Sequence, residues 1–369
     1  MVNIKKIFNN IPMPYWQSGD FLSHKKFMAM EHSKLNNTDL KFICFDHVFE
    51  HYDWTINPSK SYKQLLRDRA QQLRDTYKYL ILSYSGGHDS QTMLNAFVDN
   101  NIFIDEIYIQ RYFSKHNSLG NREQTYGAIP YMNHIRYKIP NTKVTIHDNS
   151  MDHNYYNYYI MLDEFKNRNS FEPMLVEQYY HTFEDKDIRK SFDKNNFCNI
   201  KGVDKPRLMK KDNHYHCYFV DNQLKGLLVP ESRIEFFYIT PDMPELHIKQ
   251  CHIIKNILNT EYSNVTDLEP LFHPKHEFRH KINDYLRDKI WHPFSLEAMG
   301  KPDIHIKSSM LNPKIIDDWN GIRLNDENLY KRILQLRIDI NENYGSMFND
   351  GDVLNDYKGF ISRTYDLGT

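Results

Sequence analysis

The segment Tyr79–Tyr84 constrains the fold of this chain more than any other. It is short and mostly apolar, as expected for a strand that is covered on both faces of a sheet. Two adjacent glycines, Gly86 and Gly87, end it, and apolar residues at helical spacing follow from Met93 to Val98. Because a buried strand that turns directly into an amphipathic helix is typical of a βαβ unit, the sequence predicts a parallel sheet.

Strands and helices alternate on both sides of this segment. A helix over about residues 62–77 carries apolar residues on one face and charged residues on the other. The further predicted strands are Ile102–Ile109, Val144–Ile146, Phe197–Gly202 and Ile234–Ile239, with a hairpin of His214–Asp221 and Gly226–Val229 before the last of them. The further predicted helices run over about residues 123–137, kinked at Pro130, over about 171–183, and from Asp242 onward. This alternation predicts an α/β fold with helices on both faces of the sheet.

The predicted α/β domain spans residues 61–261. Residues 1–60 lack this alternation and are expected to form an irregular N-terminal extension. After residue 261 the pattern changes to helices without strands, so residues 262–369 are predicted to be mainly helical. Two apolar stripes at helical spacing support this prediction, namely Phe278, Ile282, Tyr285, Leu286 and Ile290, and then Leu329, Ile333, Leu336 and Ile340.

The charge and hydropathy of the chain exclude several classes of protein. Lys and Arg number 47 against 48 Asp and Glu, so the net charge is −1 and there is no overall basic field of the kind that dedicated nucleic-acid binders carry. No apolar run approaches the ~18 residues of a membrane-spanning helix. The N-terminal residues are not followed by the apolar stretch of a signal peptide. We expect a cytoplasmic protein with no membrane partner.

The cysteines and histidines do not form a recognisable metal motif. The 4 cysteines are widely spaced and no Cys-x-x-Cys occurs, so we expect reduced and mostly buried thiols with no disulfide framework, zinc site or redox role. The 19 histidines include His214 and His216, which would share a strand face, and His273, His276 and His280, which could share a helix face. Without a flanking cysteine pair or a His-Glu-x-x-His sequence, both sets are interpreted as surface or hydrogen-bonded histidines.

The segment Ser85–Ser90 has the features of a phosphate-binding loop. Its two glycines allow positive φ angles and a close backbone approach. The hydroxyl groups of Ser85 and Ser90 and the free N–H groups of the following helix start can face an anion, which the helix dipole favours. No Gly-Lys-Ser/Thr ends the loop, so it is not a Walker A motif and does not predict ordinary γ-phosphate transfer.

The loop resembles the SGGxDS signature of the PP-loop ATP pyrophosphatases, in the adenine-nucleotide α-hydrolase-like superfamily. All of its fixed positions are present, as Ser85, Gly86, Gly87, Asp89 and Ser90. The resemblance covers about residues 60–260. The chain is also similar to stand-alone, phage-encoded members that are often labelled phosphoadenosine phosphosulfate reductase-like or asparagine synthase-like.

This resemblance implies a doubly wound sheet of five parallel strands in the order 3-2-1-4-5. ATP would lie over the carboxyl ends of the strands, near the switch in strand order. The resemblance assigns ATP binding to the whole loop, including His88. Ile109 and Gln110, at the end of the second predicted strand, are expected near the adenine.

The end of the fourth predicted strand, Gly202–Arg207, would lie beside the loop in such a sheet. Gly202 is therefore expected to contact the nucleotide. Lys205 and Arg207 would supply the positive charge that the loop lacks, and together with Asp89 they are the expected catalytic residues. Asp89 and Asp204 are the expected ligands of the Mg²⁺ that arrives with ATP.

The implied reaction is cleavage of ATP between the α and β phosphates. A substrate oxygen attacks the α-phosphorus, pyrophosphate leaves, and a nucleophile then displaces AMP from the adenylate. We expect an AMP-forming ligase or transferase for amide or amine transfer, including modification of a nucleotide or of a nucleic-acid base. The acceptor would be a small molecule or a nucleic-acid base, and the nitrogen would come from free ammonia, an amine or a donating partner.

Two alternatives stay open. Sulfonucleotide reductases carry a redox cysteine in a C-terminal tail, whereas the last cysteine here is Cys251, far from residue 369, and thiolation enzymes generally use paired cysteines. A sulfur-transfer or sulfonucleotide reductase-like enzyme is therefore the weaker alternative. The other is a protein that binds an adenine nucleotide without catalysis, which the intact Asp89 and both serines disfavour.

Overall fold

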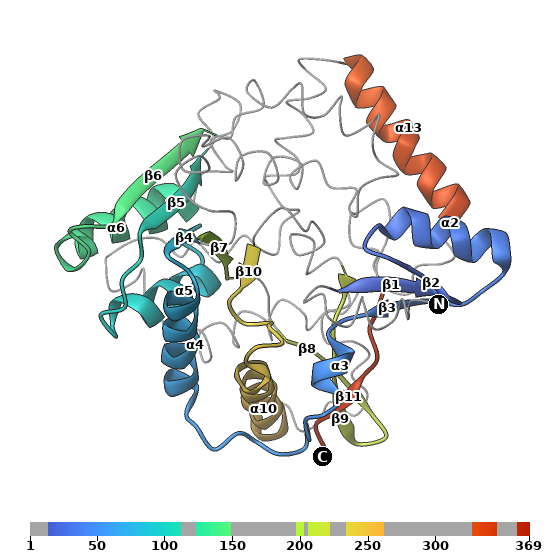
Figure 1. Ribbon diagram of the computed structural model, residues 1–369, viewed down its shortest axis with the longest axis horizontal. Coiled ribbons are helices and arrows are strands. Elements are labelled where there is room, and N and C mark those ends of the chain that lie inside the picture. Colours follow the sequence, from blue (N-terminus) through green and yellow to red (C-terminus); the bar gives the residue numbers. More distant parts are fainter. Residues whose placement is uncertain are drawn as a thin grey trace.

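The protein is described from a computed structural model, which defines residues 14–111, 123–148, 197–202, 206–221, 234–261, 327–344 and 360–369. At its centre lies a five-stranded sheet of β4 (Tyr79–Ser83), β5 (Glu106–Arg111), β6 (Lys143–Asp148), β7 (Phe197–Lys201) and β10 (Ile234–Phe236). The strands lie in the order β6-β5-β4-β7-β10, and every neighbouring pair is parallel (Figure 1). The predicted parallel α/β sheet is confirmed.

Strand β4 lies in the middle of the sheet because its side chains are apolar enough to be covered. Leu80 and Leu82 are fully buried. Ser83, the last residue of β4, lies opposite Tyr108 of β5 and Lys201 of β7. The carboxyl ends of these strands therefore meet at one edge of the sheet, where ligands of such sheets bind.

Three helices flank the strands of this sheet in sequence, and the sequence predicted a helix at each of these places. Helix α4 (Tyr62–Thr76) begins at a capping box in which Ser61 and Gln64 bond each other's backbone amides. Helix α5 (His88–Val98) follows β4, and α10 (Pro244–Glu261) follows β10; α4 contacts both (Figure 1). No helix in the described ranges is both long and apolar enough to cross a membrane.

The part of the β5–β6 connection that the structure describes begins at residue 123 and is mainly helical, but it is not one helix. It contains a π-helical turn, η1 (Glu123–Ala128), the helix α6 (Ile129–Ile135) and a 3₁₀ turn, η2 (Arg136–Lys138). The predicted break at Pro130 is present, because proline lacks the N–H that would continue the α-helical ladder and is accommodated in the first turn of α6. The π turn brings the backbone at Gly127 against the loop after β4.

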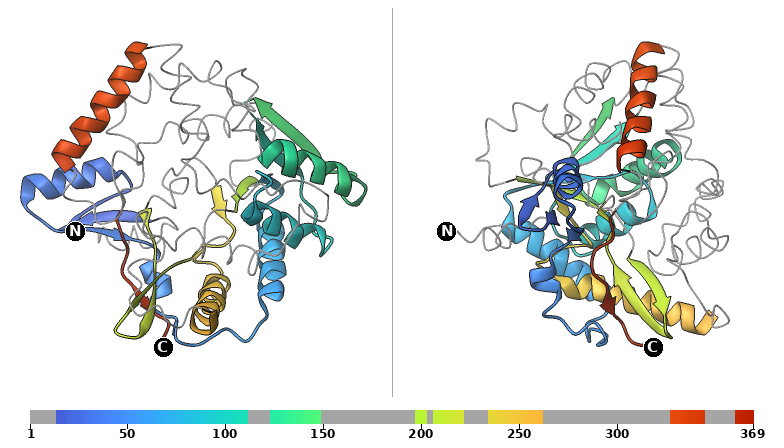
Figure 2. Two further views of the ribbon diagram at one scale, coloured as in Figure 1. Left: turned by 180° about the vertical axis from the view of Figure 1, so that it is seen from behind. Right: turned by 90° about the vertical axis from the view of Figure 1, so that its right-hand side faces the viewer.

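The predicted irregular extension is wrong for residues 15–49, which contain strands and helices. Strands β1 (Tyr15–Ser18), β2 (Phe21–Ser23) and β3 (Leu40–Ile43) form an antiparallel sheet in the order β2-β1-β3. Helices α2 (Lys26–Asn36) and α3 (Asp46–Phe49) accompany it. Its strands of three or four residues are too short to produce a clear alternation in the sequence. In Figure 2 this sheet and α2 lie on the opposite side of the molecule from β6 and α6.

A third sheet shows that the predicted hairpin has the wrong partner strand, because β9 (His214–Tyr218) forms its hairpin with the segment before it. Strand β9 pairs with β8 (Arg207–Lys211) on one side and β11 (Tyr365–Asp366) on the other, so no edge of β9 is left for Gly226–Val229, which lies outside the described residues. The turn between β8 and β9 consists of Asp212 and Asn213, whose φ angles of 52° and 63° are both left-handed. Asp and Asn tolerate this conformation, and it fits a two-residue hairpin turn.

The C-terminal region is helical only in part. Helix α13 (Glu327–Tyr344) covers the second predicted stripe, whereas the first, Phe278–Ile290, lies outside the described residues. Residues 360–369 are extended instead, because their backbone groups pair with β9 and its flanks, as between the Leu367 N–H and the Tyr215 carbonyl (2.7 Å). The ring of Tyr365 stacks on Trp54 at 4.5 Å between centroids.

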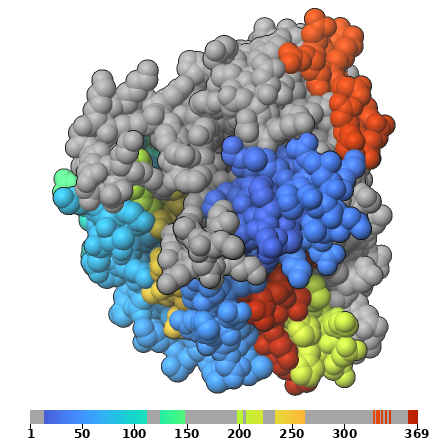
Figure 3. Space-filling model, turned by 45° about the vertical axis from the view of Figure 1, so that its right-hand side comes forward, coloured from blue at the N-terminus to red at the C-terminus, as the bar shows by residue number. Residues whose placement is uncertain are grey.

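A buried carboxylate joins the two ends of the described chain. Asp221 accepts hydrogen bonds from the indole of Trp16 (3.2 Å) and the amide of Phe360 (3.0 Å), and it lies 2.7 Å from the ammonium group of Lys26. The ion pair is almost fully buried, so losing one partner would leave an uncompensated charge. In Figure 3 the C-terminal residues, in red, contact the N-terminal segments, in blue, and the β8–β9 hairpin, in yellow-green.

Candidate functional site

The predicted phosphate loop connects β4 to α5 at the carboxyl edge of the sheet. Gly86 has φ +87°, a left-handed conformation that glycine adopts without strain. Gly87 has φ −77° and ψ 167° and directly precedes α5, which begins at His88. The first helical bond runs from the Gln91 N–H to the Gly87 carbonyl (2.9 Å). The N–H groups of the first helical turn have no acceptor within the helix, so this is a site suited to an anion.

The two serines of the loop bond each other. Their hydroxyl oxygens are 3.1 Å apart, and the Ser90 hydroxyl donates to the Gly87 carbonyl (3.1 Å). The Ser85 hydroxyl oxygen accepts from the Gly87 N–H (3.2 Å), and the Ser90 hydroxyl oxygen accepts from the Ser85 N–H (3.3 Å). These bonds fix the curvature of the loop.

Two glycines from other elements lie against the loop. A Cβ at Gly127, in η1, would be 3.0 Å from the carbonyl oxygen of Gly86. A Cβ at Gly202, directly after β7, would be 3.1 Å from the carbonyl oxygen of Asp89 and 3.3 Å from the Cα of Ser90. Both separations are shorter than ordinary van der Waals contacts of carbon, so only glycine fits without moving the loop.

Asp89 lies in the first turn of α5, with its backbone held by a buried phenol. The Tyr238 hydroxyl donates to the Asp89 carbonyl (2.7 Å). Burial raises the pKa of Tyr238 and of Tyr62, and the negative charge of Asp89 raises both further. The Oδ1 atom of Asp89 is itself buried. The first turn of α5 therefore holds a carboxylate with one buried oxygen.

A chain of buried polar side chains fixes α5 beneath the loop. The Tyr84 hydroxyl donates to Gln91, and the Gln91 amide donates to Asn95 (2.8 Å). Tyr131 of α6 donates to the same Asn95 oxygen (2.6 Å). Because these bonds join the end of β4 to two helices, they hold the N-terminus of α5 in one orientation.

Lys201 is a charged residue at this edge that the sequence reasoning missed. It is the last residue of β7, lies beside Ser83 in the sheet and directly precedes Gly202. Its side chain is buried, and burial lowers the pKa of its ammonium group to about 8. The available signal was a lysine inside the otherwise buried strand Phe197–Gly202.

The other residues predicted for the site lie in two different sheets or outside the described residues. Ile109, which is buried, and Gln110 lie in β5, next to β4. Arg207 begins β8 and so belongs to the antiparallel β8–β9 hairpin. Asp204 and Lys205 lie outside the described residues.

The predicted histidine pair is present on β9, with ring centroids 6.4 Å apart. His214 bonds the carboxylate of Asp366, whose Oδ2 atom lies 3.0 Å from His214 Nδ1. This is the expected hydrogen-bonded histidine. His273, His276 and His280 lie outside the described residues.

Comparison of the chain with protein-family models, with curated proteins and with solved structures finds no match. The arrangement itself combines a helix N-terminus, a kind of position that can bind an anion, with a loop confined by two glycines and a lysine at the same end of the sheet. These features together fit a polyphosphate group.

Proposed function

We propose that this protein is an ATP pyrophosphatase of the PP-loop type, which cleaves ATP to AMP and pyrophosphate in order to adenylate a substrate. The observation that carries the proposal is the position of Ser85–Ser90, between the carboxyl end of the central strand β4 and the N-terminus of α5. The strand order also supports it. Numbered along the chain within the sheet, β6-β5-β4-β7-β10 are the third, second, first, fourth and fifth strands, the order of this superfamily.

The proposed role of the loop is to bind the terminal phosphates of ATP. The N–H groups of the first turn of α5 and the hydroxyl groups of Ser85 and Ser90 donate to phosphate oxygens, and the helix dipole favours their charge. Lys201 adds a positive charge from the end of β7. Lys205 and Arg207 are proposed to act on the leaving pyrophosphate from the segment that follows it. Ile109 and Gln110 are proposed to lie beside the adenine.

Magnesium bound to the phosphates would neutralise part of their charge. Asp89, in the first turn of α5, is one of its proposed ligands. Asp204 is the second proposed ligand.

The proposed reaction has two steps. A substrate oxygen attacks the α-phosphorus, the bond to the bridging oxygen of the β-phosphate breaks, and pyrophosphate leaves with that electron pair. A nitrogen nucleophile then displaces AMP from the adenylate. The protein contributes by positioning the reactants and by neutralising charge. The acceptor is proposed to be a small molecule or a nucleic-acid base, with ammonia or an amine as donor.

Product analysis tests this proposal. Purified protein incubated with ATP and Mg²⁺, alone and with candidate acceptors, is expected to release AMP and pyrophosphate in equal amounts. Gly87→Val, which adds a branched side chain where the anion would lie, is the matched inactive control and is expected to stay folded without binding ATP. ADP and orthophosphate as main products would contradict the proposal. ATP binding without turnover under all these conditions would favour a nucleotide-binding protein without catalysis.

A further inference from the structure

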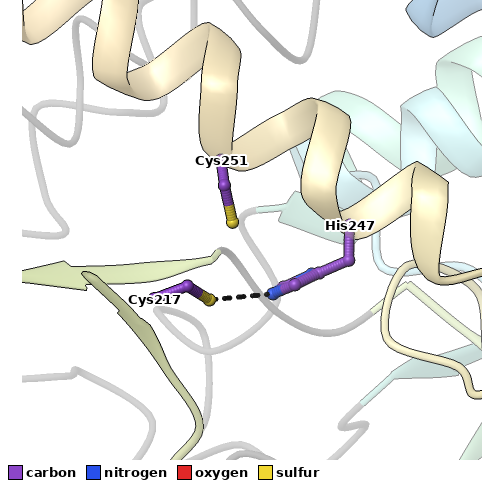
Figure 4. Close-up of side chains that lie close together, drawn as sticks. All are labelled: Cys217, His247 and Cys251. Atoms are coloured by element: carbon purple, nitrogen blue, oxygen red, sulfur yellow. Dashed lines mark hydrogen bonds between the residues drawn. The ribbon is translucent and has the colours of Figure 1, made fainter. Parts of the chain in front are cut away.

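Three potential metal ligands come together away from the loop. They are the thiol of Cys217, on β9, and the imidazole of His247 and the thiol of Cys251, both on α10 (Figure 4). All three residues are fully buried, and their ligand atoms lie within 4.8 Å of one another. His247 and Cys251 are one helical turn apart, so they share a face of α10.

The spacing of these atoms fits a tetrahedral zinc site. Zinc binds sulfur at about 2.3 Å and imidazole nitrogen at about 2.0–2.1 Å, which places the two ligand atoms about 3.6 Å apart at a tetrahedral angle. The distance between Cys217 Sγ and His247 Nε2 is 3.6 Å. The two sulfurs and the nitrogen therefore need little movement to enclose an ion.

The side chains around His247 orient its ring toward the two thiols. The ring of Phe219 stacks on it at 5.0 Å between centroids, and Trp54 contacts its edge at 6.3 Å. A ligand held by packing in its binding orientation needs little reorganisation when the ion binds.

Charge balance favours a divalent ion in this position. Two thiolates and a neutral imidazole carry two negative charges, so a divalent ion makes the buried group neutral. Thiolate and imidazole ligands in tetrahedral geometry are typical of zinc.

We propose that Cys217, His247 and Cys251 bind one zinc ion in a buried, structural site. The site would link the β8–β9 hairpin to α10 of the α/β domain. A buried site with no position open to solvent is typical of structural rather than catalytic zinc. This proposal departs from the expectation of no zinc, which rested on cysteine spacing alone, and it does not depend on the proposed ATP chemistry.

Metal analysis of the full chain tests the site. Protein purified, stripped with a chelator and reloaded with zinc is expected to retain about one zinc per chain, whereas Cys217→Ala and Cys251→Ala retain less than about a tenth of an equivalent. Cys198→Ala is the matched control, since Cys198 is equally buried but lies in β7, and it is expected to retain the ion.

A second measurement keeps the proposal testable if those variants misfold. Cobalt added to the stripped parent is expected to give the visible absorption of a tetrahedral cobalt–thiolate centre, and the chelator is expected to lower the Tm of the parent. Less than about a tenth of an equivalent of zinc in the reloaded parent would overturn the proposal. A Cys217–Cys251 disulfide in freshly purified protein, or stoichiometric iron, would overturn it as well.

Discussion

Gly202→Val is expected to reduce ATP binding beyond detection, a loss of more than about 100-fold. The carbonyl of Asp89 and the Cα of Ser90 lie so close to Gly202 that a Cβ would meet them at 3.1 Å and 3.3 Å. These neighbours are backbone atoms in the first turn of α5, so they move only if the helix N-terminus moves with them. Gly202→Ala requires a smaller shift and is expected to give a smaller loss. Isothermal titration with ATP measures both.

A destabilised variant outside the site separates this effect from general loss of structure. Phe42→Leu removes volume from the buried face of β3, in the N-terminal sheet, and should lower the Tm while leaving ATP affinity unchanged. Parent-like affinity in a folded Gly202→Val protein would mean that the nucleotide does not bind at this loop.

Lys201→Met is expected to weaken ATP binding by about 10- to 150-fold, the equivalent of one charge-assisted hydrogen bond of about 1.5–3 kcal/mol. Methionine keeps about the volume of the buried side chain and removes its ammonium group. Lys143→Met is the matched control. Lys143 is the first residue of β6, so it lies at the amino-terminal end of its strand, away from the carboxyl ends where the loop lies, and it is half-exposed. The same affinity for the Lys201→Met protein as for the parent would show that Lys201 does not face the phosphates.

The pH dependence of ATP affinity gives an independent test of Lys201. Burial lowers the pKa of its ammonium group to about 8, and a bound phosphate would raise that pKa again. Affinity is therefore expected to be full below pH 8 and to fall as the pH rises above it, by up to about tenfold per unit. Lys201→Met should lack this decline. Because burial disfavours the charged form, the free energy of unfolding of the ligand-free parent should rise as the pH increases above about 8.

The α/β domain could be predicted because short, contiguous stretches of its sequence indicate each strand, turn and helix. The apolar segment Tyr79–Ser83, the glycines after it and the periodicity of α4 each specify their own structure within a few residues. The N-terminal sheet could not be predicted in this way. Its strand β2 has only three residues, and buried side chains such as Trp16 obtain their partners from elsewhere in the chain.

The candidate site likewise combines residues that are adjacent in the sequence with residues that only the fold brings together. The loop Ser85–Ser90 is contiguous, so its residues could be identified together. The roles of Gly127 and Gly202 depend on how closely separate backbones approach, which no spacing in the sequence expresses. Cys217 and Cys251 likewise belong to a strand and a helix that only the fold brings together, and so their separation in sequence resembles no metal motif.

The pairing of β9 with β11 has a consequence for how the protein is made. Residues 214–218 obtain one of their two neighbouring strands from residues 365–366, which the ribosome adds almost 150 residues later. At a synthesis rate of about 5–20 residues per second, a nascent β9 waits roughly 7–30 s with one edge open. During that interval the edge can pair with a neighbouring nascent chain on the same message. Chaperone occupancy during translation is therefore expected to persist from the emergence of β9 until residues 360–369 arrive.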